Sequence, residues 1–222
     1  PAAACSHRRG AGRRPTGQAP LTGLAAPPVP GGGLGAAGGN RREATWAGTV
    51  LPAPQDKPEF TLTDTSGRPY DFKARTEGRF TVLTFGYTHC PDVCPIDLAT
   101  LDTAMEALVP SVRGKVGVVF VTSHPALDTP PVLREFLDRF DTGFVGLTGS
   151  LQQVQDAQAA AKVPIATIGK KDSSGEYTVG HATQMILYAP DGQARIVYPF
   201  GTRQSDWTRD LPRLLAGEEP AS

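Results

Sequence analysis

The amino-acid sequence predicts an α/β domain with a central mixed sheet flanked by helices. Apolar, β-branched segments alternate along the chain with segments of helical periodicity, and turn residues separate them. The Gly, Ala and Pro excess is concentrated in residues 1–50, which hold almost no aromatic side chains. The rest of the chain, about 170 residues, is long enough to bury one α/β core.

This composition divides the chain into three parts. Residues 1–45 form a disordered leader or linker because they cannot bury enough apolar surface to offset ordering entropy. Residues 46–217 form the domain, and residues 218–222 are a flexible tail. The basic cluster at residues 8–14 has some likeness to a twin-arginine export signal, and the alanines before Cys5 to a lipidation site. The apolar segment expected before a lipidated cysteine is missing, so a low-complexity leader is the default interpretation.

The predicted elements start after a Pro-rich linker over residues 41–58, which becomes ordered near Trp46. Residues 60–64 and 70–72 form an N-terminal β-hairpin around a turn at residues 65–69. Residues 79–85 and 116–122 are apolar almost throughout, which is typical of strands buried on both faces.

Shorter strands and four helices complete the domain. The strands are expected at residues 144–147, 185–188 and 194–198, and the helices at residues 95–109, 129–140, 150–161 and 205–215. Pro212 should kink or shorten the last helix. Strands that alternate with helices in the first half imply parallel pairing. This order of elements predicts a thioredoxin-like fold.

Two of the three cysteines, Cys90 and Cys94, lie where the first buried strand gives way to a helix. The free N–H groups and the dipole of that helix can lower the pKa of either thiol. Pro95 cannot donate a backbone hydrogen bond and biases Cys94 away from helical torsions. We therefore expect both sulfurs on a short loop or distorted turn ahead of the helix, close enough to share a metal ion or to form a disulfide.

Three interpretations of this pair remain open. The cysteines are structural in a non-catalytic interaction module, or they are the redox pair of a thiol–disulfide oxidoreductase or peroxidase, or they clamp a metal ion. The spacing of three residues, rather than the two of the thioredoxin motif, weakens the redox interpretation.

His181 favours the metal interpretation. It lies in a polar, glycine-containing loop before the strand at residues 185–188, and such a loop can return to the end of the sheet that bears the cysteines. Two thiolates and one imidazole suit Cu(I) and can hold Cu(II). Zinc accepts the same ligands but normally takes a fourth. His124 is a reserve ligand, whereas His89 should point away from Cys90.

Several segments together resemble the Sco/SenC family of copper-binding assembly factors over residues 49–215. They are FTLTDTSGRP, TFGYTHCPDVCP, DTPPVLREFLDRF, FVGLTGS, GHATQMILYAPDGQ and YPFGT. The resemblance implies a thioredoxin-like domain held outside the cytoplasm, in the cell envelope or on the periplasmic face of a membrane. It also implies that the protein delivers copper to the binuclear copper centre of a cytochrome c oxidase subunit, or reduces the cysteines of that centre.

By the same resemblance, Cys90 and Cys94 match the family's sulfur ligands and His181 its imidazole ligand. A disulfide between the two cysteines would abolish metal binding and so act as a switch. Asp128 matches the aspartate of the family's Asp-Thr-Pro run, which we interpret as a turn or cap residue. The chain departs from the family at His124, where an acidic residue is usual, and no N-terminal membrane anchor is visible.

The partners follow from the same interpretation. We expect a copper-receiving oxidase subunit, other copper carriers or thiol reductants, and a protein that is mostly monomeric. Nucleic acid is not expected as a partner, because 22 basic and 22 acidic side chains give a net charge of zero.

Overall fold

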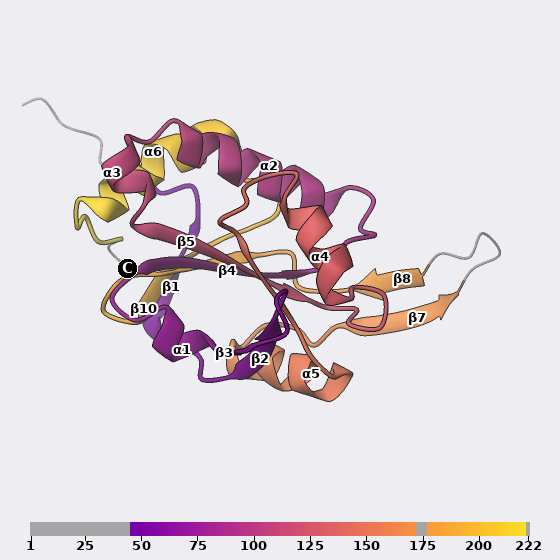
Figure 1. Cartoon of the computed structure of the whole chain (residues 1–222). Helices are drawn as coiled ribbons and strands as arrows, with labels where there is room; N and C mark the ends of the chain where they lie inside the picture. Colours follow the sequence, from indigo (N-terminus) through magenta and orange to yellow (C-terminus); the bar gives the residue numbers. More distant parts are fainter. Residues whose placement is uncertain (1–44, 172–176, 221–222) are drawn as a thin grey trace, which may run out of the picture. The chain divides into compact units, whose positions relative to one another are not determined.

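The computed structural model describes residues 45–171 and 177–220, so Cys5 and nearly all of the predicted leader lie outside the described residues. Within them, an eight-stranded mixed sheet has the order β1-β10-β9-β4-β5-β6-β2-β3 (Figure 1). β4, β5 and β6 are parallel, and the other neighbouring strands are antiparallel. The strands of this sheet are β1 (Thr49–Asp56), β2 (Thr61–Asp64), β3 (Pro69–Asp71), β4 (Phe80–Gly86), β5 (Val116–Thr122), β6 (Val145–Thr148), β9 (Met185–Tyr188) and β10 (Gln193–Tyr198).

Helices cover both faces of the sheet (Figure 1). They are α1 (Phe72–Arg75), α2 (Val93–Glu106), α3 (Pro110–Arg113), α4 (Pro130–Leu137), α5 (Leu151–Ala160) and α6 (Gln204–Leu215). A further pair of strands, β7 (Thr167–Lys171) and β8 (Tyr177–Gly180), forms a separate two-stranded sheet. No helix in the described part of the chain has the length and apolar character needed to cross a membrane.

The two faces of the sheet carry two separate cores because side chains alternate along each strand. On β4, Val82 packs into the core that α2, α4 and α6 cover, whereas Leu83 and Phe85 pack into the core that α1 and α5 cover. β5 alternates in the same way. Both strands are therefore apolar along nearly their whole length. The predicted thioredoxin-like class is confirmed, as is the N-terminal hairpin, in which Leu62 pairs with Tyr70.

The strand β1 was not expected, because Pro52 and Pro54 had indicated a linker. It forms the edge of the sheet and pairs antiparallel with β10. The register shifts between Val50 and Gln55, the stretch that holds both prolines. Proline has no N–H group to donate to a neighbouring strand. It is tolerated here because one side of an edge strand has no neighbour and because residues in a bulge do not all form ladder hydrogen bonds.

Of the two effects predicted for Pro212, a kink or a shortening of the last helix, the shortening was wrong. α6 continues through Pro212 to Leu215. Its inward face buries Trp207, Leu211 and Leu214 against the sheet. The packing of this face outweighs the single backbone hydrogen bond that proline removes.

Asp210 fixes the start of the domain to this helix. Its side chain is fully buried and accepts hydrogen bonds from the Ala47 N–H (2.9 Å) and the Tyr198 hydroxyl (3.3 Å). Arg209 Nε lies 2.9 Å from the other carboxylate oxygen. The first described residues are thus attached to α6 through a buried acceptor.

We predict that Asp210→Ala lowers the free energy of unfolding by about 1–3 kcal/mol, because two donors lose their buried acceptor. Urea denaturation measures the change. Arg209→Ala is the matched control: it removes the partly exposed ion pairs of Arg209 with Asp210 and Asp206, leaves both donors to Asp210 in place, and should cost less than about 1 kcal/mol. Equal losses in the two variants would contradict the role given to the buried acceptor.

Candidate metal centre

The two cysteines lie at the carboxyl end of β4. After Gly86 the chain turns, and the Cys90 N–H donates to the Tyr87 carbonyl at 3.2 Å. α2 begins three residues after Cys90, at Val93. Both cysteines are buried and neither forms a disulfide. The turn places a dithiol where backbone N–H groups at a helix N-terminus favour negative charge.

The expectation that both sulfurs precede the helix was wrong for Cys94. Cys94 lies in the first turn of α2, and Pro95 follows it there. A proline is accommodated in this turn because its missing N–H would have had no partner inside the helix. The interpretation was correct for Cys90, which lies in the preceding loop.

His181 reaches the cysteines through the pairing of β4 with β9. These strands are antiparallel, with Thr84 opposite Met185, so the residues just before β9 lie beside the end of β4. The loop predicted around His181 is in part a strand, since β8 ends at Gly180 and pairs with β7. This strand was missed because Tyr177–Gly180 is too short to show a clear alternation.

The structure brings the three side chains together. One ligand atom each from Cys90, Cys94 and His181 lies within 4.8 Å of the other two. The Cys94 sulfur is 3.7 Å from Nε2 of His181. No fourth histidine, cysteine, aspartate or glutamate joins this cluster among the described residues. The arrangement offers two sulfurs and one nitrogen to a single ion.

Two carbonyls orient the His181 ring. Nδ1 lies 2.6 Å from the Ala182 oxygen and 3.1 Å from the Phe85 oxygen, and both can only accept. We therefore assign a proton to Nδ1, which makes Nε2 the ring nitrogen that faces the sulfurs. Tyr87 supports the ring edge-on, with centroids 5.5 Å apart. Orienting partners of this kind are typical of metal-ligating histidines.

The two thiols differ in acidity. The hydrogen bond from the Cys94 thiol lowers the pKa of Cys90 despite burial. The backbone N–H of Cys94, the His181 side chain and the backbone N–H of Asp92 add to the effect. The same hydrogen bond raises the pKa of Cys94, together with burial and the negative charge on Cys90. In the metal-free protein the pair therefore holds one negative charge, on Cys90.

Gly86 leaves the space that the Cys94 sulfur occupies. A β-carbon at this position would lie 2.6 Å from that sulfur and 2.8 Å from the ring of Phe120. The strand predicted at residues 79–85 stops one residue before Gly86, and no role was predicted for this glycine. A glycine between a buried strand and a cysteine turn was the available signal for close approach.

The sequence patterns also did not indicate Asp97 as a buried carboxylate near the cysteines. It lies on α2 one turn after Cys94 and is buried. Burial raises its pKa to about 6, the N–H of Gly201 opposes this by donating to the carboxylate, and the negative charge of Cys90 adds to it. Its spacing of three residues from Cys94 on a helix was the signal that could have indicated it.

The other candidates lie outside the cluster. His89 is half exposed, and its Nδ1 is 3.0 Å from the Thr88 hydroxyl oxygen. His124 is buried, and its Nδ1 accepts a hydrogen bond from the Leu127 N–H at 3.3 Å. Asp128 is fully buried and does not cap α4, whose N-cap residue is Thr129. Of the two roles expected for Asp128, the cap was therefore wrong, because its carboxylate accepts hydrogen bonds from Thr88 and Thr122 instead. The turn is confirmed, since the Asp128 N–H closes a turn on the His124 carbonyl.

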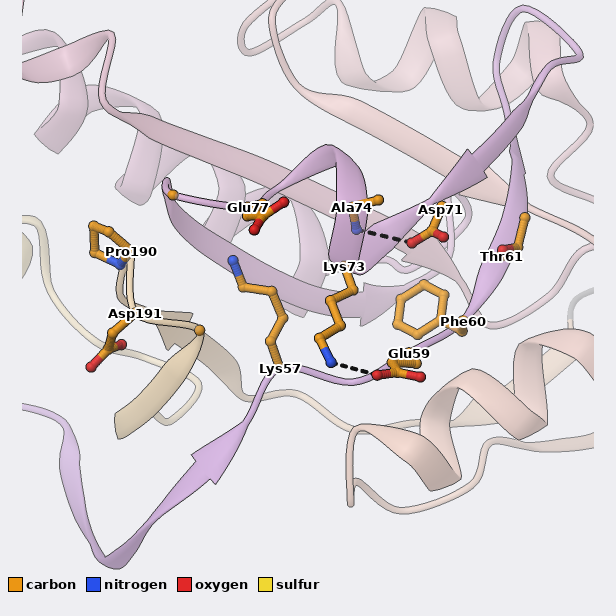
Figure 2. A pocket seen from close by; sticks show the side chains of 12 residues that line it. Lys57, Glu59, Phe60, Thr61, Asp71, Lys73, Ala74, Glu77, Pro190 and Asp191 are labelled. Atoms are coloured by element: carbon orange, nitrogen blue, oxygen red, sulfur yellow. Dashed lines mark hydrogen bonds and ion pairs between the residues drawn. The ribbon is translucent and has the colours of Figure 1, made fainter.

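A cleft of about 760 Å³ lies at the other end of the sheet (Figure 2). Lys57 lines it and donates from Nζ to the Thr76 carbonyl at 2.7 Å, and burial lowers its pKa to about 8. Asp191 and Gly192, also in the lining, follow β9, whose Tyr188 pairs near the start of β4. The cysteines follow the end of β4, so this cleft is separate from the cluster.

Comparison with known proteins adds the family. Residues 50–216 match the family model described as SCO1/SenC. This chain belongs to the SCO1/SenC family. The match spans β1 to α6 and includes all three cluster residues.

SCO1/SenC relatives agree in sequence and in structure. A putative copper-binding protein of Stutzerimonas stutzeri is 31% identical over 76% of this chain and 81% of its own length. Apo Sco1 from Thermus thermophilus is 30% identical, with a TM-score of 0.68 over 77% of this chain and 97% of that one. Bradyrhizobium japonicum ScoI, solved with copper bound, is 30% identical, with a TM-score of 0.61 over 72% and 99%.

We predict that iodoacetamide alkylates Cys90 faster than Cys94 at pH 6. A lowered pKa means that the Cys90 thiolate persists as the pH falls below about 8.5, where an ordinary thiol protonates. Peptide mapping by mass spectrometry in a Cys5→Ser background measures both rates. In the control Cys94→Ala, which lacks the donor to Cys90, the midpoint of Cys90 alkylation should rise. A shared midpoint near pH 8.5 for both thiols would rule out the asymmetry.

We also predict that Gly86→Ala lowers the free energy of unfolding by about 1–3 kcal/mol through overpacking. Gly117→Ala on the neighbouring strand is the control, because a β-carbon there meets nothing closer than the Phe80 carbonyl at 3.9 Å. Denaturant titration of both variants gives the comparison. If the two variants were equally stable, Gly86 would not be required for close approach.

Proposed function

We propose that this SCO1/SenC protein is a copper carrier that binds the ion through Cys90, Cys94 and His181. The observation that supports this most directly is the approach of these three ligand atoms to within 4.8 Å of one another. Copper is the cargo in this proposal. The domain at residues 46–217 carries the site, and residues 1–45 are its leader or linker.

The donor set favours Cu(I). Thiolate is a soft ligand, and three donors satisfy Cu(I), whereas a structural zinc site normally has four. Thiolate and imidazole bonds of about 2.0–2.3 Å to a trigonal ion place the donors roughly 3.5–4.0 Å apart. The Cys94 sulfur and Nε2 of His181 are already 3.7 Å apart. Cu(II) can use the same ligands.

Delivery would proceed by ligand exchange. An incoming thiolate or imidazole displaces one of the three donors while the other two retain the ion, and three-coordination leaves room for this step. Family membership supports a client in cytochrome c oxidase assembly, the subunit that carries the binuclear copper centre. It also supports a site outside the cytoplasm, on or near the membrane.

A second candidate function is the reduction of a disulfide in the same client. The asymmetry of the two thiols favours it. The Cys90 thiolate would attack one sulfur of the client disulfide, and the other client sulfur would leave as a thiolate. Cys94 would then lose its proton and attack Cys90, which releases the second client thiolate and leaves Cys90 and Cys94 oxidised. One molecule cannot perform both functions at the same moment, because the oxidised cysteine pair cannot bind copper.

We predict that His181→Ala weakens Cu(I) binding about tenfold or more, because one of three ligands is lost, which corresponds to about 1.4 kcal/mol. Competition against a Cu(I) chelator measures the affinity. Binding by the wild type should also weaken as the pH falls, because protons compete for the thiolates and the imidazole.

His89→Ala is the matched control, since His89 is a half-exposed imidazole next to Cys90 that lies outside the cluster. It should bind Cu(I) as the wild type does. X-ray absorption of the copper-loaded protein should show two sulfurs for each nitrogen. Equal affinities of the wild type and His181→Ala would rule out the three-ligand site.

A further inference from the structure

A buried carboxylate supports the loop that carries Cys90. Asp128 follows β5, and its side chain is fully buried. Its two oxygens accept three hydrogen bonds: from the Thr88 N–H (3.1 Å), the Thr88 hydroxyl (2.6 Å) and the Thr122 hydroxyl (2.5 Å). Burying a carboxylate is costly unless donors of this kind compensate for lost water.

These bonds connect two segments that are distant in sequence. Thr88 lies in the loop between β4 and α2, and Thr122 is the last residue of β5. Within the loop, the Cys90 N–H bonds to the carbonyl of Tyr87. Because Thr88 lies between these two residues, its attachment to Asp128 limits how far the loop can move relative to β5.

The backbone of Asp128 is itself held by two hydrogen bonds. The Asp128 N–H donates to the His124 carbonyl at 3.1 Å, and the Thr148 hydroxyl lies 3.4 Å from the Asp128 carbonyl oxygen. The Thr88 hydroxyl donates to Asp128 and so accepts from Nδ1 of His89 at 3.0 Å. This contact directs the His89 ring toward Thr88.

We propose that Asp128 is a positioning residue for the metal centre, which holds Thr88 and thereby keeps Cys90 within reach of Cys94 and His181. The expected effect on copper binding rests on the proposed function. The position of Asp128 beside Thr88 rests on the hydrogen bonds between them. Asp128 contributes no ligand atom to the cluster.

The test is Asp128→Asn. Asparagine keeps the shape but replaces one acceptor oxygen with an NH₂ group, so the side chain can no longer accept all three hydrogen bonds. Loss of an orienting partner outside the ligand shell typically costs about 10–100-fold in metal affinity, and we expect a loss of this size for Cu(I). Thr88→Val should weaken binding in the same direction, and Thr88→Ser, which keeps the hydroxyl, should restore it.

Thr122→Val is the matched control. It removes one hydrogen bond from the same carboxylate on the side of β5, so it should lower the melting temperature while Cu(I) affinity stays within about threefold of the wild type. A folded Asp128→Asn variant with wild-type affinity would overturn the proposal. If Asp128→Asn does not fold, Thr88→Val is the test. Wild-type affinity of Thr88→Val for Cu(I) would then overturn the proposal.

A measurement without copper separates this proposal from the proposed function. In metal-free protein, Asp128→Asn and Thr88→Val should reduce the preference of iodoacetamide for Cys90 over Cys94, because a displaced Cys90 loses the Cys94 hydrogen bond. Thr122→Val should keep the preference. Unchanged preference in all three variants would refute the positioning role, whereas a wild-type protein that binds no Cu(I) would refute only the carrier function.

Discussion

The metal centre depends on the antiparallel pairing of β4 with β9. β4 ends in the turn that leads to Cys90, and β9 begins four residues after His181. With Thr84 opposite Met185, the pairing returns a distant segment of chain to the end of the sheet where the dithiol lies. A shift of this register by one residue would turn every side chain of β9 to the other face and remove the imidazole from the site.

Around this pairing, neighbouring groups fix the state of each donor. Carbonyls of Phe85 and Ala182 accept from Nδ1 of His181 and leave Nε2 available. The Cys94 thiol donates to Cys90 and stabilises its thiolate. The metal-free site thus already holds a thiolate on Cys90, so binding an ion through both sulfurs requires the proton of Cys94 to leave.

The same acidity difference suits thiol–disulfide chemistry, in which one thiolate attacks and the second thiol resolves. A single site can therefore serve both proposed activities, and its oxidation state would decide which is available. Asp128 has a place in both, because each requires Cys90 to remain beside Cys94.

The sequence by itself determined the class of fold and the identity of the three candidate ligands. Apolar runs such as Val116–Thr122 report burial on both faces directly, and few residue types other than cysteine and histidine offer soft donors. It did not determine the edge strand β1, the continuation of α6 through Pro212, or the position of Cys94 on α2, because in each case local proline preferences were outweighed by packing or by position in the element. Only the tertiary structure decided the roles of Gly86 and Asp128. Both act through contacts with residues far away in sequence, Gly86 with the ring of Phe120 and Asp128 with Thr88, and a local pattern does not identify the partner in such a contact.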